Sequence, residues 1–171
     1  MKMEKRITVR QFITIMRLYG IEAAELSPAE VRSYKNKWYR TFVSLTDDND
    51  RLRAVCLGID DDRLVPGDCN RDVREYDFRG FLWYVYRCEA VADYRKGGYA
   101  KTAFNKQPKK EMILVDNFSR ENTAFLIRGA PDMKAAELDR LTDVTITDID
   151  FEWTYSKTHE ERWFGPYFHK K

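Results

Sequence analysis

The stretch MILVDNFSRENTAFLI, residues 112–127, decides the fold class of this chain. Two short apolar runs, 112–115 and 123–127, flank a polar turn. Apolar runs of this length on either side of turn residues are typical of paired strands, so the stretch predicts a β-hairpin. A second hairpin is predicted over 144–147 and 151–155, where apolar and polar residues alternate.

Toward the N-terminus the apolar period lengthens to that of helices. Residues 8–19 predict a first helix that ends at Gly20, and Ser27-Pro28-Ala29-Glu30 is a capping box that begins a second. Further helices are expected over 77–86, which should be central and buried, and over 99–105 and 132–141, whereas 47–59 suits either a helix or a strand. We therefore expect an α+β fold in which N-terminal helices pack on a small, mainly antiparallel sheet of about four strands formed by the C-terminal half.

Composition bounds the class of protein. The chain has 171 residues, 14% aromatic residues and a net charge of +2, which predicts one folded domain over 1–171 and excludes a globally basic nucleic-acid binder. Three cysteines without C-x-x-C spacing favour a reduced protein without a disulfide framework. Without an apolar leader or membrane span, we expect a cytoplasmic location. No motif for a metal or a cofactor is present, and neither is expected.

The common catalytic signatures are absent, so the chemistry concentrates in residues 148–160. The catalytic candidates there are His159, Glu160 and Thr158, because an imidazole beside a carboxylate can exchange protons near neutral pH. If the strand continues past residue 155, alternation places His159 on the side of Trp153 and Tyr155, and Glu160 on the opposite side. This favours a hydrogen-bonded histidine at the edge of an aromatic core over a catalytic dyad.

Residues 95–110 form a basic segment with no acidic residue and with interleaved aromatics. Basic residues beside stacking side chains suit single-stranded nucleic acid. The candidates for such contacts are Lys101, Lys106, Lys109 and Lys110. Because the net charge is near zero, a solvated helix and loop is the favoured interpretation and a nucleic-acid partner is not expected.

The C-terminal block resembles a known family. Asp148-x-x-Phe151-x-Trp153-Thr154-x-x-x-Thr158-His159-Glu160, followed by Gly165-Pro166-Tyr167-Phe168, is similar to the ending of a mainly bacterial family of uncharacterised proteins, the domain of unknown function DUF4275. Weaker blocks extend the resemblance over about 34–168. The resemblance implies a fold that agrees with the α+β prediction and carries no established activity. In that family a histidine usually follows the Phe-Leu-Trp run, where this chain has Tyr84.

Three hypotheses of function follow. The first is a non-enzymatic module of immunity or regulatory type that binds a protein partner, since Trp and Tyr are frequent binding hot spots. Its candidate binding residues are Trp153, Thr154, Trp163, Tyr167 and Phe168, and Trp163, Phe164, Tyr167 and Phe168 are expected to be exposed. The second is a small hydrolase or ligand-binding enzyme with His159 as general base. The third is binding of single-stranded nucleic acid through the basic segment. The sequence does not indicate an oligomeric state.

Overall fold

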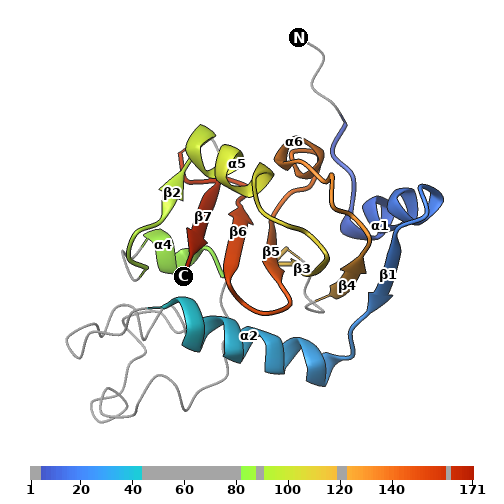
Figure 1. The fold of residues 1–171 in the computed structure, drawn as a ribbon, viewed down its shortest axis with the longest axis horizontal. Coiled ribbons are helices and arrows are strands. Elements are labelled where there is room, and N and C mark those ends of the chain that lie inside the picture. The colour runs from blue at the N-terminus through green and yellow to red at the C-terminus, as the bar shows by residue number, and fades with distance from the viewer. Residues whose placement is uncertain (1–4, 44–81, 88–90, 119–122, 161–162) are drawn as a thin grey trace.

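The computed structural model describes residues 5–43, 82–87, 91–118, 123–160 and 163–171. Its centre is an antiparallel sheet of seven strands (Figure 1). In spatial order the strands are β1 (Glu22–Glu25), β4 (Ala124–Arg128), β3 (Glu111–Asp116), β5 (Val144–Asp148), β6 (Trp153–Lys157), β7 (Tyr167–Lys170) and β2 (Arg95–Lys96). The two predicted hairpins therefore form the middle of the sheet.

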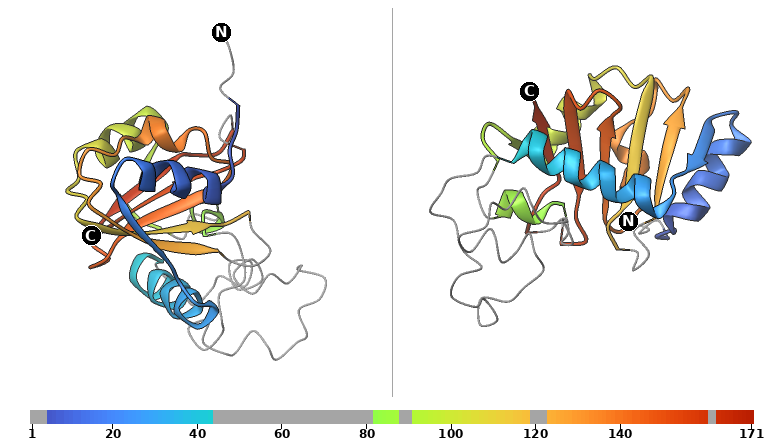
Figure 2. Two further views of the ribbon diagram at one scale, coloured as in Figure 1. Left: turned by 90° about the vertical axis from the view of Figure 1, so that its right-hand side faces the viewer. Right: turned by 90° about the horizontal axis from the view of Figure 1, so that it is seen from below.

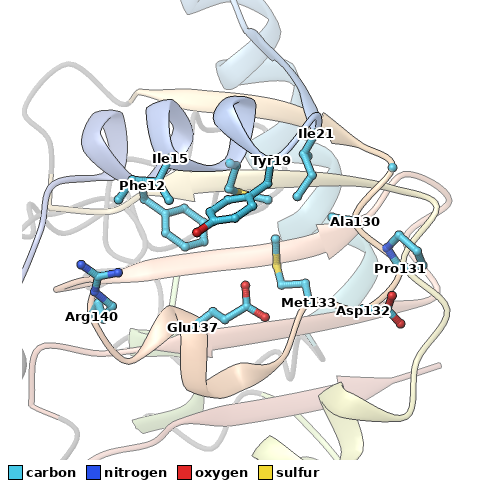
Figure 3. Close-up of a pocket in the computed structure, with 12 residues that line it drawn as sticks. Phe12, Ile15, Tyr19, Ile21, Ala130, Pro131, Asp132, Met133, Glu137 and Arg140 are labelled. Carbon is cyan, nitrogen blue, oxygen red and sulfur yellow. The ribbon is translucent and has the colours of Figure 1, made fainter.

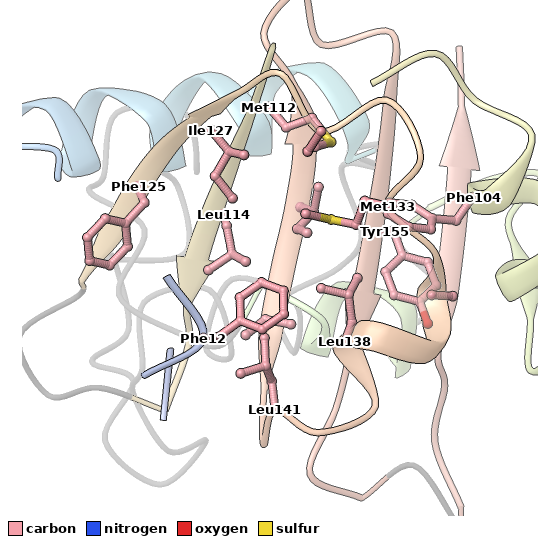
Figure 4. Close-up of a cluster of buried hydrophobic side chains, with 14 of the residues drawn as sticks. Phe12, Phe104, Met112, Leu114, Phe125, Ile127, Met133, Leu138, Leu141 and Tyr155 are labelled. Carbon is pink, nitrogen blue, oxygen red and sulfur yellow. The ribbon is translucent and has the colours of Figure 1, made fainter. Parts of the chain in front are cut away.

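Helices lie on both faces of the sheet (Figure 2). One face carries α1 (Val9–Leu18), α5 (Gly98–Asn105) and α6 (Ala135–Leu138), and the other carries α2 (Pro28–Phe42) and α4 (Tyr84–Arg87). Alternation along β3 divides the core between the faces. Met112 and Leu114 join the cluster under α1 (Figure 4), whereas Ile113 and Val115 join the cluster under α2. The fold is thus a three-layer sandwich with two separate apolar cores.

The predicted capping box at the start of α2 is confirmed, since Ser27 and Glu30 form reciprocal hydrogen bonds there. Thr8 and Gln11 form a second box at α1, which was not predicted. Each box satisfies backbone N–H groups that the first helical turn leaves without partners. α5 agrees with its predicted range, whereas α6 is shorter than 132–141.

The prediction of about four strands and of helices gathered before them is wrong. β1, β2 and β7 extend the sheet to seven strands, and α5 and α6 lie within the C-terminal half. β1 has the sequence EAAE and carries no strand signal of its own. It is held by pairing with β4, by a 2.6 Å hydrogen bond from Arg17 to the Ala23 carbonyl, and by an ion pair between Arg10 and Glu25.

The second hairpin begins at Val144 as predicted, but the turn between β5 and β6 delays its second strand by two residues. The Asp148 carboxylate accepts from the backbone N–H groups of Glu152 and Trp153 at 2.7 and 2.8 Å. Phe151 has φ of 59°, which no strand residue adopts, so β6 begins at Trp153.

Two predicted elements fall partly or wholly outside the described residues. The segment 47–59 lies outside them, as does 77–81 of the predicted central helix. Leu82, Trp83, Val85 and Tyr86, which follow, are buried as expected. In the described part of the chain, no helix is long and apolar enough to cross a membrane.

Candidate functional site

A buried carboxylate organises one end of the sheet, where β3 ends and β5 begins. Asp143 has only 1% of its surface exposed and accepts three side-chain hydrogen bonds. The donors are Trp83 Nε1 at 2.9 Å, His159 Nδ1 at 2.8 Å and Asn117 Nδ2 at 3.2 Å. Burial raises the pKa of Asp143, and the hydrogen bonds from His159, Asn117 and Trp83 oppose that rise. We call Asp143, Trp83, Asn117 and His159 the Asp143 cluster.

His159 reaches Asp143 because β6 ends at Lys157. Thr158 then donates its hydroxyl to the Phe164 carbonyl at 2.6 Å, and the chain turns. The alternation that would place His159 beside Trp153 and Tyr155 therefore does not apply, because the strand does not continue to His159. Its ring lies instead between the rings of Trp83 and Phe118, with centroids 5.8 and 5.7 Å away.

The two nitrogens of His159 face different carboxylates. Nδ1 donates to Asp143, and Nε2 lies 4.0 Å from Glu160 Oε1. The His159 side chain keeps 31% of its surface exposed, whereas Asp143 is enclosed. The buried carboxylate thus holds one imidazole nitrogen, while the ring stays partly accessible. This arrangement can orient a general base, or it can hold a surface loop in place.

Of the three catalytic candidates, Thr158 has a structural role. Its side chain is fully buried, and its hydroxyl is engaged by Phe164. Glu160 accepts backbone hydrogen bonds from Trp163 and Phe164 through its carbonyl, and its Oε2 is buried without a hydrogen-bond partner in the described part of the chain. The three residues were grouped as candidates because they are neighbours in the sequence. In the structure, only the side chains of His159 and Glu160 face each other.

The other members of the Asp143 cluster were not identified from the sequence. Trp83 is 60 residues away from Asp143 along the chain, and Asn117 is 26 residues away. No fixed spacing could have indicated these pairs. The available signal was weaker. Asn117 directly follows the apolar strand β3 and Asp143 directly precedes β5, and antiparallel pairing brings these two strand ends together.

A line of buried hydroxyls continues from this cluster under α2. Asn117 also donates to Thr145, whose hydroxyl lies 2.9 Å from that of Ser156. Farther along, Thr154 receives the indole N–H of Trp38 at 2.8 Å. Thr154, one of the candidate binding residues, is therefore occupied in joining α2 to the sheet.

The remaining candidate binding residues divide between the core and the surface. Trp153, Tyr167 and Phe168 have at most 3% of their surface exposed, because β6 and β7 are both internal strands of the sheet. The expectation that Tyr167 and Phe168 are exposed is wrong, and Phe164 is only partly buried, stacked on Trp83. Trp163 is exposed over 70% of its surface.

Trp163 lies beside the β2 end of the sheet. Lys96 donates its ammonium to the Trp163 carbonyl at 3.3 Å, and Arg95 and Lys96 are both exposed on this last strand. Tyr99 follows in the first turn of α5 and is 81% exposed. We call Arg95, Lys96, Tyr99 and Trp163 the β2 edge.

The four lysines proposed for nucleic-acid contacts do not form one surface. Lys109 is 1% exposed, donates to the Gln107 carbonyl at 3.0 Å, and has its pKa lowered by burial. Lys101 pairs with Asp139 at 2.9 Å. Lys106 and Lys110 are exposed.

Metal ligands do not gather in the part of the chain that the structure describes, where no group of three or more His, Cys, Asp or Glu side chains could hold an ion. Comparison with curated proteins and with solved structures gives no significant match to either. Comparison with family models gives one, to the domain of unknown function DUF4275, over residues 71–168. The matched segment spans more than half of the chain and contains the whole Asp143 cluster together with the β2 edge. The chain belongs to the DUF4275 family.

Proposed function

We propose that the protein is a non-enzymatic module that binds an acidic segment of a partner protein at the β2 edge. The observation that carries this proposal is the exposure of Trp163 and Tyr99, at 70% and 81%, beside the exposed cations Arg95 and Lys96. Large aromatic side chains and arginine supply most hot spots of protein interfaces. Cations at the rim of such a surface favour an acidic partner and accelerate its association.

The position of these residues supports the same assignment. β2 is the last strand of the sheet and pairs only with β7 among the strands that the structure describes. Two hydrogen bonds join the segment around Trp163 to β2 and the residue that follows it. The Lys96 side chain donates to the Trp163 carbonyl, and the Gly97 N–H donates to the Pro166 carbonyl at 2.9 Å. A surface that is already ordered loses less conformational entropy when a partner binds.

The test is quantitative capture of partners from the native host by the full chain, with two matched pairs of variants. Lys96→Glu is compared with Lys106→Glu, which makes the same charge change at the opposite end of α5. Trp163→Ala is compared with Leu18→Ala, which removes an exposed apolar side chain from α1. We expect the first variant of each pair to lose the captured protein and the second to keep it.

The captured protein must then bind through an acidic segment, and the affinity must fall as salt concentration rises. Equal losses in Lys96→Glu and Lys106→Glu would contradict docking at the β2 edge and favour a diffuse basic surface. A partner that binds the Trp163→Ala variant as well as the wild type would reject the proposal.

A second candidate function, general-base catalysis by His159, is favoured by the 2.8 Å contact between its Nδ1 and the buried Asp143. A positioned general base typically contributes about 10²- to 10⁴-fold to a rate. Activated esters are a suitable first probe, and His159→Gln and Asp143→Asn are the variants. Hydrolysis that falls by at least about 100-fold in His159→Gln would support the base. Hydrolysis at the rate of the buffer, or equal in wild type and His159→Gln, would exclude it for this substrate class.

A further inference from the structure

A second site lies on the other face of the sheet, between α1 and the segment that joins β4 to α6 (Figure 3). It is a cavity of about 510 Å³, within the range of small-molecule sites. Its apolar lining consists of Phe12, Ile15, Met16, Ile21, Ala130 and Met133. Methionine side chains adapt their shape to a bound apolar group, so two of them in one lining suit a small hydrophobic ligand.

The polar groups of this cavity lie mainly on the wall opposite α1. Glu137 belongs to α6 and Arg140 follows it by three residues. The Glu137 carboxylate points toward Tyr19, the C-cap residue of α1, and Arg140 lies below Phe12 (Figure 3). The cavity therefore has an apolar lining that carries one cation and one anion close together along the chain. A third charged residue, Asp132, lies at the far end.

Neither of the two charges is fully used within the described part of the chain. Arg140 Nε is buried and has no hydrogen-bond acceptor there. Glu137 accepts the Lys134 N–H at 2.8 Å through Oε1 only. Because Nε is buried, a ligand in the cavity would meet the terminal nitrogens of this guanidinium, and arginine pairs with carboxylates through such parallel N–H groups.

We propose that this cavity binds an apolar α-amino acid. Its carboxylate pairs with the Arg140 guanidinium, its ammonium group pairs with Glu137, and its side chain packs against Phe12, Met16 and Met133. A simple carboxylic acid would satisfy Arg140 but would bring a second negative charge beside Glu137. A simple amine would bring a second positive charge beside the Arg140 guanidinium. A zwitterion with an apolar side chain matches all three parts of the lining.

The cavity lies between one part of the chain that the family model matches and one part that it does not match. β4 and α6 lie within the matched residues 71–168, whereas α1 lies outside them. The cavity is formed on the α1 face, and none of its lining residues belongs to the β2 edge. Failure of amino-acid binding would therefore leave the proposed partner binding untouched, and the reverse also holds.

The first measurement is calorimetric titration of the full chain with L-phenylalanine and with L-methionine, up to about 10 mM, a concentration that detects millimolar affinity. Three matched ligands each lack one feature: N-acetyl-L-phenylalanine lacks the ammonium group, phenethylamine lacks the carboxylate, and glycine lacks the apolar side chain. We expect each to bind at least tenfold more weakly than the better of the two amino acids, which corresponds to about 1.4 kcal/mol.

The second measurement repeats the titration with variants. Arg140→Gln removes the cation, and Glu137→Gln removes the anion but keeps an acceptor for the Lys134 N–H. Arg32→Gln, on α2 at the opposite face, is the control for loss of a charge. We expect at least tenfold weaker binding in the first two variants and less than twofold change in the control, with unchanged circular dichroism in all three.

The proposal is overturned if neither amino acid binds the folded wild type. It is also overturned if N-acetyl-L-phenylalanine or phenethylamine binds as tightly as L-phenylalanine, since the site would then read a single charge. Equal binding by wild type and a folded Arg140→Gln variant would place the ligand elsewhere.

Discussion

Replacement of Lys35 by methionine should stabilise the protein at neutral pH. Lys35 lies in α2, and only 4% of its surface is exposed. Burial lowers the pKa of this ammonium group from 10.5 to about 8. Methionine has a similar length and no charge, so it can fill the same space without the desolvation penalty, although it also loses the interaction that Lys35 makes with its surroundings.

The size and pH range of the effect follow from linkage. A difference of about 2.5 pH units at 1.36 kcal/mol per unit corresponds to about 3 kcal/mol, which is an upper value for the gain in Lys35→Met at pH 7. The unfolded chain keeps its proton up to about pH 10.5, whereas the native chain releases it above about pH 8. The free energy of unfolding of the wild type should therefore rise with pH between these values, and the advantage of the variant should shrink.

Urea denaturation at pH 7, 8, 9 and 10 measures both quantities. Lys37→Met is the control in the same helix. Lys37 is exposed and lies 4.3 Å from the centroid of the Phe151 ring, so this control should lose about 0.5–1 kcal/mol of cation–π attraction instead of gaining stability. A Lys35→Met variant less stable than the wild type at pH 7 would refute the reasoning. So would an advantage that stays constant from pH 7 to 10.

Three further substitutions test separate features by chemical or thermal denaturation. Asp143→Ala removes the acceptor of three hydrogen bonds and should destabilise the protein by about 3–5 kcal/mol. Its control, Asp139→Ala, removes the ion pair with Lys101 and should change the stability by at most about 1 kcal/mol. Equal effects of the two substitutions would contradict the importance of the Asp143 cluster. Gly165→Ala should destabilise by about 1–3 kcal/mol, because Gly165 has φ of 85° and a Cβ there would lie 3.1 Å from the Tyr167 ring; an unchanged melting temperature would show that the turn relaxes freely. Ser27→Ala removes the side-chain cap of α2 and should destabilise by about 1 kcal/mol, and a change below about 0.3 kcal/mol would mean that the cap is dispensable.

The parts of the fold that sequence reasoning predicted are those determined by neighbouring residues. The β3–β4 hairpin depends on two apolar runs and the turn between them, and α2 depends on the capping box at Ser27. Both patterns act over a few residues and keep their meaning in any tertiary context. α1 was predicted from the spacing of its apolar residues, whereas the Thr8–Gln11 box that begins it was not recognised.

The strands that sequence reasoning missed are determined by their partners. β1 and β2 are four and two residues long and are rich in charged residues or alanine. Their own sequences favour no strand, and pairing with β4 and β7 supplies the hydrogen bonds that hold them extended. β7 was identified only as an aromatic group after a turn, so its pairing with β6 and β2 inside the sheet was not predicted.

The candidate site was predicted in part for a similar reason. His159 was identified as the important imidazole, but its partner was sought at Glu160, the next residue. The structure gives Asp143 as the hydrogen-bonded partner, 16 residues away, because β6 returns the chain to the start of β5. Side-chain alternation failed at His159 because it assumes that a strand continues, and β6 ends at Lys157.

β1 also protects the sheet against unwanted assembly. The open side of an edge strand is a template on which another chain can add a strand, and natural proteins block such edges with charges and with local contacts. Without β1, the apolar strand β4 would become that edge. β1 covers it with only four residues and places the charges of Glu22 and Glu25 at the boundary. The Arg17 guanidinium occupies the Ala23 carbonyl at the same place. The segment before residue 71, which the family model does not match, thus gives this member a terminal strand that is poorly suited to fibril-like growth.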